Sequence, residues 1–140
     1  MINSRDIKEL HPIVGLKAAR LVQSCKGQGI DLLITSTYRD HQSQNALYAI
    51  GRTMPGKKVT NAKGGQSFHN FRVAFDVVPL VNGKAVWSDS GLWQHIGKLG
   101  KDLGLEWAGD WRTFKEMPHF QFTQGLTLKD FQQGKNLKEK

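Results

Sequence analysis

The chain has 140 residues, one cysteine and a formal net charge of +8 at pH 7. A chain of this length can bury a hydrophobic core by itself, and a single cysteine excludes an internal disulfide framework. No apolar run is long enough to span a bilayer, and the first residues lack the hydrophobic stretch of a signal peptide. We therefore expect a single domain over residues 1–140, made in the cytoplasm, and the charge indicates an anionic partner or surface.

The first part of the chain is expected to form two helices with a strand between them. A helix is predicted over residues 11–26, because Pro12 suits a first helical turn and glycines follow the segment. Cys25 shares the apolar face of this helix, which predicts a core position. Residues 31–37 are a short apolar strand, and residues 41–50 form a second helix that ends at a glycine.

The middle of the chain predicts a loop and then a β-hairpin. Residues 53–66 contain glycine, proline and lysine without periodicity, which is typical of a loop, and we expect it to border a cleft. Residues 71–80 are apolar and β-branched, as in a buried strand. The pair Asn82–Gly83 is a strong turn signal, so residues 84–87 should return beside the first strand.

The last part predicts a helix, a loop and a closing strand. Ser90 is expected to cap a helix that runs to residue 103, and residues 107–115 are expected to be a loop. Residues 119–122 alternate polar and aromatic side chains, as a half-buried strand does. Residues 123–140 are a variable basic tail, and its last part, residues 135–140, is expected to be a solvated, fraying end. Strict alternation of strand and helix is missing, so we expect an α+β fold with a small antiparallel sheet and helices packed on one side.

Four residues have the types and positions of a catalytic zinc site. Zinc in hydrolytic sites takes three nitrogen or oxygen ligands and leaves one position for water, and His69, Asp76 and His119 would be those ligands. Asp76 stands in the middle of a buried strand, where an unpaired carboxylate would carry a large desolvation cost; a metal ion removes that cost. Glu116 precedes His119 by three residues and is a candidate general base. The alternative for His119 is a solvent-facing position beside a core strand.

Three other side chains are candidates for the same site. Arg39 lies where the first strand meets the second helix, and it could bind an oxyanion or a substrate carboxylate; its alternative is a surface salt bridge. Ser67 is expected on the same strand face as His69, where it could orient a ligand or bind the substrate backbone. Trp107 and Trp111 could form a wall of the cleft or belong to the core.

These motifs resemble the zinc peptidases of the peptidoglycan L-alanyl-D-glutamate endopeptidase and D-alanyl-D-alanine carboxypeptidase type. The core of the resemblance is Ser67-Phe68-His69, then six residues, then Asp76, and much later Glu116 two positions ahead of Pro118-His119. Further blocks extend it over about residues 10–122: Thr37-Tyr38-Arg39, Gln44, Ala46-Leu47-Tyr48, Gly51-Arg52-Thr53, residues 59–65, Gly104-Leu105-Glu106-Trp107 and Gly109-Asp110-Trp111. The basic tail, residues 123–140, matches nothing in the family.

The resemblance implies a hedgehog-like peptidase fold with one zinc ion. It implies catalytic roles for Glu116 and Arg39, and substrate-binding roles for Gln44, Ser67 and Trp111. The expected reaction is hydrolysis of the L-Ala–D-Glu bond in peptidoglycan stem peptides, with a D-Ala-D-Ala-type carboxypeptidase as the alternative. A wall-cutting domain without an export signal further resembles a phage or prophage endolysin. We expect such a protein to be a monomer, to meet the anionic envelope, and to reach the periplasmic wall after the membrane is permeabilised.

Two positions depart from the family pattern. Arg72 stands where relatives often carry glycine, and Glu116 stands where the nearest relatives often carry aspartate. The first departure adds a bulky cation close to a ligand, and the second shifts the carboxylate by one methylene group.

Two other classes of protein compete with a peptidase. A basic metal nuclease would suit the net charge, yet it would leave Arg39 and Gln44 unexplained, so no nucleic-acid partner is expected. A wall-binding module that kept the zinc site without catalysis would have no need of Glu116.

Overall fold

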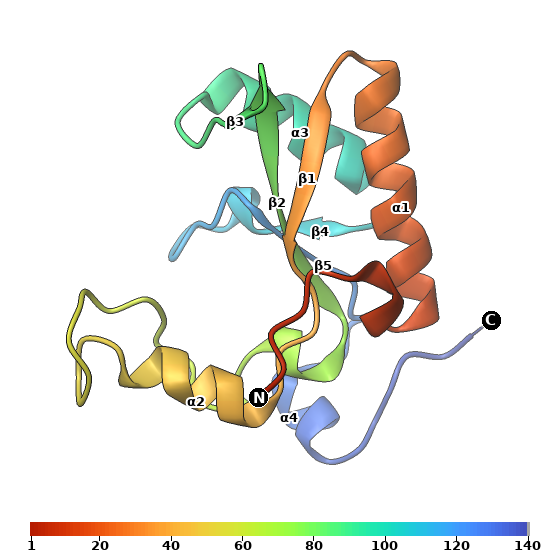
Figure 1. The fold of residues 1–140 in the computed structure, drawn as a ribbon. Coiled ribbons are helices and arrows are strands. Elements are labelled where there is room, and N and C mark those ends of the chain that lie inside the picture. The colour runs from red at the N-terminus through yellow and green to blue at the C-terminus, as the bar shows by residue number, and fades with distance from the viewer. Residues whose placement is uncertain (140) are drawn as a thin grey trace.

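The computed structural model describes residues 1–139, which fold around a five-stranded antiparallel sheet (Figure 1). The strands are β1 (Asp31–Ser36), β2 (Ala74–Val81), β3 (Lys84–Ala85), β4 (Glu106–Trp107) and β5 (His119–Gln121). The α-helices are α1 (Pro12–Gly27), α2 (His41–Ala49), α3 (Ser90–Asp102) and α4 (Leu128–Gln132). Three short 3-10 helices are η1 (Ile7–Glu9), η2 (Phe68–Phe71) and η3 (Ala108–Asp110). The predicted α+β class is confirmed.

Strand β2 is the centre of the sheet. The strand order is β1-β2-β5-β4, and β3 pairs with the far end of β2. In the β2–β5 register, Phe75 lies opposite Phe120 and Asp76 lies opposite His119. Because successive side chains of a strand point to opposite faces, this register gives the sheet one apolar face and one face that carries the two metal-ligand candidates.

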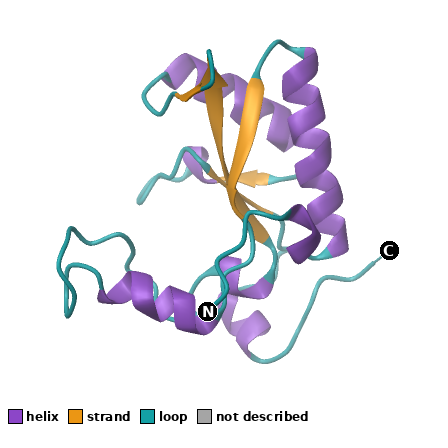
Figure 2. Cartoon of the chain, viewed as in Figure 1, coloured by secondary structure: helices purple, strands orange, loops and turns teal. Residues whose placement is uncertain are grey.

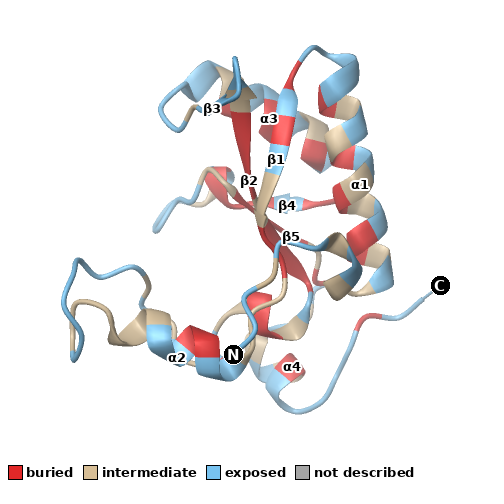
Figure 3. Cartoon of the chain, viewed as in Figure 1, coloured by how far each residue is buried: buried red, intermediate tan, exposed pale blue. Residues whose placement is uncertain are grey.

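The apolar face is covered by α1 and α3, which lie together on one side of the sheet (Figure 2). Phe75 and Phe120 stack at 5.8 Å between ring centroids, and Trp107 stacks on Phe120 at 6.5 Å. A Cβ atom added at Gly100 of α3 would lie 2.3 Å from the Phe120 ring. Small residues on α3 therefore let this helix lie close against the aromatic layer, and Figure 3 shows the buried residues gathered there.

Three places differ in kind from the sequence predictions, and the other element ends shift by one or two residues. The cap of α3 is Asp89, whose carboxylate accepts a hydrogen bond from the Leu92 amide at 3.0 Å, and Ser90 is the first helical residue. Part of the segment expected to be a loop, residues 107–115, forms the end of β4 and η3. The strand expected from residue 71 begins at Ala74, because the preceding residues form η2.

The first part of residues 123–140 includes the short helix α4; of the end expected to be solvated, residues 135–139 are exposed except Leu137, which is 7% exposed, and residue 140 lies outside the described residues. Helix α4 has a capping box between Thr127 and Asp130, and its Phe131 is only 4% exposed. The Phe131 ring lies 5.9 Å from Phe68 and 5.6 Å from Phe71. The end of the chain therefore packs against η2, the short helix that carries His69. Within residues 1–139, no helix has the length and apolar character needed to cross a membrane.

Candidate metal centre and active-site cleft

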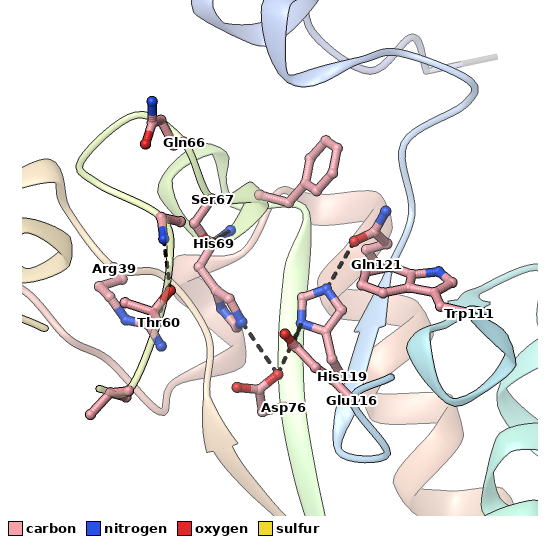
Figure 4. A pocket seen from close by; sticks show the side chains of 13 residues that line it. Arg39, Thr60, Gln66, Ser67, His69, Asp76, Trp111, Glu116, His119 and Gln121 are labelled. Carbon is pink, nitrogen blue, oxygen red and sulfur yellow. Dashed lines mark hydrogen bonds and ion pairs between the residues drawn. The ribbon is translucent and has the colours of Figure 1, made fainter. Parts of the chain in front are cut away.

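Three side chains from three separate elements meet on the polar face of the sheet (Figure 4). His69 comes from η2, Asp76 from β2 and His119 from β5. Asp76 Oδ1 lies 3.3 Å from His69 Nε2 and 3.1 Å from His119 Nδ1. One ligand atom from each of the three residues lies within 4.8 Å of the other two. Two imidazoles and one carboxylate at this spacing fit a metal ion with three protein ligands and an open side.

The second nitrogen of each histidine ring is held by a protein oxygen. His69 Nδ1 donates to the Thr37 carbonyl at 2.8 Å, and His119 Nε2 donates to Gln121 Oε1 at 2.8 Å. Gln121 in turn contacts Glu106, at 3.3 Å. Such contacts select the tautomer and the ring orientation of a metal-binding histidine, so His69 Nε2 and His119 Nδ1 are left free to face a metal ion beside Asp76.

The protonation state of Asp76 agrees with this arrangement. Burial opposes ionisation of Asp76, but its contacts with His119 and His69 outweigh burial and hold the pKa of the carboxyl well below its usual range. Burial also acts to lower the pKa of His119, yet the hydrogen bond and the charge of Asp76 raise it overall. Asp76 is therefore a carboxylate at neutral pH, as a metal ligand must be.

The backbone around His69 is held by a cap at each end of η2. Ser67 Oγ accepts a hydrogen bond from the His69 amide at 3.2 Å, so Ser67 is the N-cap of η2 and not a residue on a strand. Asn70 completes a capping box and also donates to the Arg39 carbonyl at 2.8 Å. After η2 the chain turns at Arg72, in the left-handed region with φ 65°. The short helix thus fixes His69 and the backbone of Arg39 together.

Arg72, one of the two positions that depart from the family pattern, contacts Tyr38 and Glu9. Its guanidinium lies 3.8 Å from the centre of the Tyr38 ring and donates to Glu9 Oε2 at 3.0 Å. These contacts offset the cost of a non-glycine residue at positive φ, which is about 1–3 kcal/mol.

A cleft of about 390 Å³ opens in front of the three ligand candidates. Glu116 lines it with a side chain that is 57% exposed, and Glu116 Oε1 lies 3.8 Å from His119 Nδ1. The Trp111 ring lies 5.7 Å from the His119 ring. Ser67 also lines the cleft. The cleft therefore brings together the Glu116 carboxylate, the Trp111 ring and the three ligand candidates.

Arg39 lines the same cleft, and its guanidinium is fixed by hydrogen bonds to two side chains. Its Nη1 donates to Gln44 Oε1 at 2.8 Å, and its Nη2 donates to Ser36 Oγ at 3.1 Å. The buried Nε has no hydrogen-bond partner within residues 1–139. Burial lowers the pKa of Arg39, while the charges of Asp76 and Glu116 partly oppose this. The surface salt bridge considered from the sequence is not found, since both contacts are to neutral groups.

Gln44 lies behind Arg39 and does not line the cleft. Its side chain is completely buried, at 0% exposure, and its Nε2 donates to the Ala62 carbonyl at 2.8 Å. The amide thus joins Arg39 to the loop that follows α2. Trp107 is also buried, and its Nε1 donates to the Met117 carbonyl at 2.8 Å, so Trp107 belongs to the core and supports the segment before His119.

Sequence reasoning gave no role in the site to three residues that orient it: Thr37, Asn70 and Gln121. Only Gln121 had a local signal. It follows His119 by two residues on a strand, so the two side chains are expected on the same face. The contacts of Thr37 and Asn70 depend on η2 lying against the turn after β1, and no local pattern reports that.

The fold and the site define the class of protein, a metallopeptidase with a His-Asp-His group in an active-site cleft. A peptidase M15 family model described as D-alanyl-D-alanine carboxypeptidase matches residues 60–122. The chain is 37% identical over 122 residues to the peptidoglycan L-alanyl-D-glutamate endopeptidase CwlK of Bacillus subtilis, covering 81% of this chain and 73% of that protein. The chain belongs to the peptidase M15 family, and the predicted resemblance is confirmed.

Two further comparisons agree with this assignment. The chain is 34% identical over 112 residues to an L-alanyl-D-glutamate peptidase of a Listeria phage, covering 75% of this chain but only 35% of the phage protein. The solved structure of the L-Ala D-Glu endopeptidase ChiX of Serratia marcescens superposes with a TM-score of 0.62 at 22% identity, over 93% of this chain and 92% of that one. DacB from Streptococcus pneumoniae gives a TM-score of 0.64 at 19% identity, over 93% and 80%. Because both solved structures have low sequence identity to this chain, these two comparisons support the fold alone.

Proposed function

We propose that this chain is a zinc-dependent endopeptidase that hydrolyses the L-Ala–D-Glu bond of peptidoglycan stem peptides. The observation that carries the proposal is the three-ligand group at the floor of a cleft, with the Glu116 carboxylate 3.8 Å from a ligand histidine. The names of the Bacillus and Listeria phage relatives support this choice of bond over the D-Ala-D-Ala alternative.

His69, Asp76 and His119 would hold one zinc ion, through two ring nitrogens and one carboxylate oxygen. When bound, the ion supplies a Lewis acid and lowers the pKa of a bound water toward about 7. The contacts from Thr37 and Gln121 keep both rings in the tautomer that this role requires.

Glu116 acts as the general base and then as the general acid. Its carboxylate takes a proton from the attacking water, whose oxygen bonds to the carbonyl carbon of L-Ala. As the C–N bond breaks, Glu116 returns the proton to the departing amine of D-Glu. Its partial exposure in the cleft leaves the carboxylate accessible to both groups.

Arg39 stabilises negative charge on the substrate. Its guanidinium can donate to the developing oxyanion or to a substrate carboxylate. Gln44 and Ser36 hold it in place before substrate binds, so little ordering is needed at the moment of reaction. Ser67 and Trp111 line the cleft where the stem peptide would lie.

We further infer a role on the cell wall, as an endolysin that acts as a monomer once the membrane is permeabilised. The net charge of +8 favours approach to the anionic envelope and to the carboxylates of the stem peptide. The phage peptidase among the relatives supports this setting.

Mass spectrometry of purified peptidoglycan tests the proposal. The zinc-loaded protein should release fragments with a new amino terminus at D-Glu, and Glu116→Gln should reduce the rate by about 10²–10⁴ while binding the same amount of zinc. Asp110→Asn, which removes an exposed carboxylate paired with Lys101, is the matched control and should keep full activity. Release of terminal D-Ala would reassign the chain to the carboxypeptidases, and an intact wall with bound zinc would refute peptidase activity on this substrate.

A further inference from the structure

The active-site cleft continues into a second hollow of about 590 Å³. The two share Glu116 and four residues of the loop after α2, and the second hollow adds residues from α4 and the loop before β5. We call this second hollow the outer groove. Its apolar lining is Val59, Ala62, Phe114 and Leu128, and its amides are Asn61, Gln66 and Gln132. Arg39 lines only the cleft, so Glu116 stands where the two hollows join.

The outer groove differs in charge from the rest of the protein. The whole chain has 20 lysine and arginine residues, yet Glu116 is the only ionisable residue among the described residues that line the groove. The cleft, by contrast, is lined by Arg39 beside the carboxylates of Asp76 and Glu116. Arg39 is the only lysine or arginine among the described residues that line either hollow, so a substrate carboxylate finds a cationic partner in the cleft and none in the outer groove.

Phe114 is the most unusual residue of the groove. Its side chain is 79% exposed, and its backbone is in the left-handed region at φ 53°. A bulky residue in that region costs about 1–3 kcal/mol, and burial in the core does not offset this cost here. Val59, 60% exposed, lines the same groove. An aromatic ring presented to solvent beside an active site is suited to contact with an amphipathic ligand.

The substrate of the proposed function has the matching polarity around the bond to be cut. On the leaving side, D-Glu carries a carboxylate, which suits Arg39. On the other side, the amino group of L-Ala is joined by an amide to the lactyl group of N-acetylmuramic acid. That sugar carries hydroxyl and acetamido groups and no charge, because its carboxyl group is used in the amide.

We propose that the outer groove binds the N-acetylmuramoyl group, with Phe114 against the apolar face of the sugar ring. The amides of Asn61, Gln66 and Gln132 would hydrogen-bond to its hydroxyl and acetamido groups. Gln132 Nε2 already donates to the Gly65 carbonyl at 2.7 Å, so α4 holds this wall of the groove in place. The inference rests on the proposed function, and it makes Phe114 a specificity residue for glycan-linked stem peptides.

Two substrates that differ in the group on the L-Ala nitrogen test the inference. One is N-acetylmuramoyl-L-Ala-D-Glu-L-Lys, and the other is N-acetyl-L-Ala-D-Glu-L-Lys, which keeps the amide but lacks the sugar. We expect kcat/KM of the zinc-loaded protein to be about tenfold higher for the muramoyl substrate, as one aromatic contact allows. Phe114→Ala should remove that preference and change kcat/KM for the acetyl substrate less than about twofold, whereas Phe114→Tyr should keep the preference.

Trp87→Ala is the control, because Trp87 is an exposed aromatic residue outside both hollows; it should leave both substrates unchanged. Equal kcat/KM for the two substrates, or an equal loss on both in Phe114→Ala, would overturn this inference and leave the proposed function standing. Hydrolysis of neither substrate would overturn the proposed function, and the inference with it.

Discussion

Asp76 is the residue on which the site depends most. It lies in the central strand, opposite Ser36 on one side and His119 on the other, and it contacts both candidate ligand histidines. A buried carboxylate without partners would be costly, so its position in an apolar strand predicted a metal ion from sequence. The two histidines that satisfy it lie seven and 43 residues away, and only the second is brought to it by strand pairing.

Gln44 offers a test of how Arg39 is positioned. Gln44→Ala removes the acceptor of Arg39 Nη1 and the donor to the Ala62 carbonyl. We expect a loss of about 1–3 kcal/mol in the free energy of unfolding, since buried polar groups lose their partners. kcat should fall about tenfold because the guanidinium is no longer held. Gln42→Ala, at an exposed position of the same helix, is the control for both measurements, and an unchanged kcat in Gln44→Ala would argue against a positioning role.

Cys25 should be unreactive in the folded protein. Burial raises the pKa of its thiol to about 11, so the thiol stays neutral at about pH 8, and the thiolate is the reactive form. A chromogenic disulfide reagent should label the native protein slowly and label one thiol rapidly in denaturant. Fast labelling of the native protein would contradict the core position of Cys25.

At the level of elements, the contact between α3 and the sheet depends on glycine. Gly100→Ala would place a Cβ 2.3 Å from the Phe120 ring, whereas nothing lies within 4 Å of a Cβ at Gly27 in α1. We expect Gly100→Ala to lower the free energy of unfolding by about 1–3 kcal/mol through overpacking. Gly27→Ala should leave it unchanged or raise it by up to about 1 kcal/mol. Denaturant titration of both variants measures this, and equal stabilities would show that α3 adjusts without strain.

Helix α4 supports the candidate site although none of its residues lines the cleft. Phe131 joins α4 to the rings of Phe68 and Phe71 on the helix that carries His69. Phe131→Ala should cost about 3–5 kcal/mol, as for other buried phenylalanines. Thermal unfolding checks this against Trp87→Ala, which truncates an exposed ring and should have a small effect. A small loss in Phe131→Ala would mean that the end of the chain adds little to the fold.

At the level of the whole molecule, one bound ion should link three elements. A ligand that binds only the folded state stabilises it, by about 2.7 kcal/mol at 100 times its Kd. Zinc added to chelator-treated protein should therefore raise Tm by several degrees, about 3–10 °C. Asp76→Ala should abolish the shift, and Asp110→Asn should keep it. The same rise in Asp76→Ala would place the ion elsewhere.

Much of the molecule could be predicted from local sequence patterns. Helix α1, the hairpin of β2 and β3, and the shared face of His119 and Gln121 follow from periodicity and turn chemistry, which act over a few residues. The ligand set, His69, Asp76 and His119, could be proposed because zinc restricts the residue types that hold it. By itself, the sequence determined most of the elements and the chemistry that they carry, but not the short elements η2, β4 and α4.

The tertiary structure decided which distant side chains share a site. It placed Gln44 behind Arg39, packed Phe131 beneath the helix of His69, and joined Phe114 to α4 in the outer groove. Each of these contacts links segments that no helix or strand period connects. They arise when the sheet and helices bury a common core, because the packing of whole elements, and not the preference of any single segment, determines which surfaces meet.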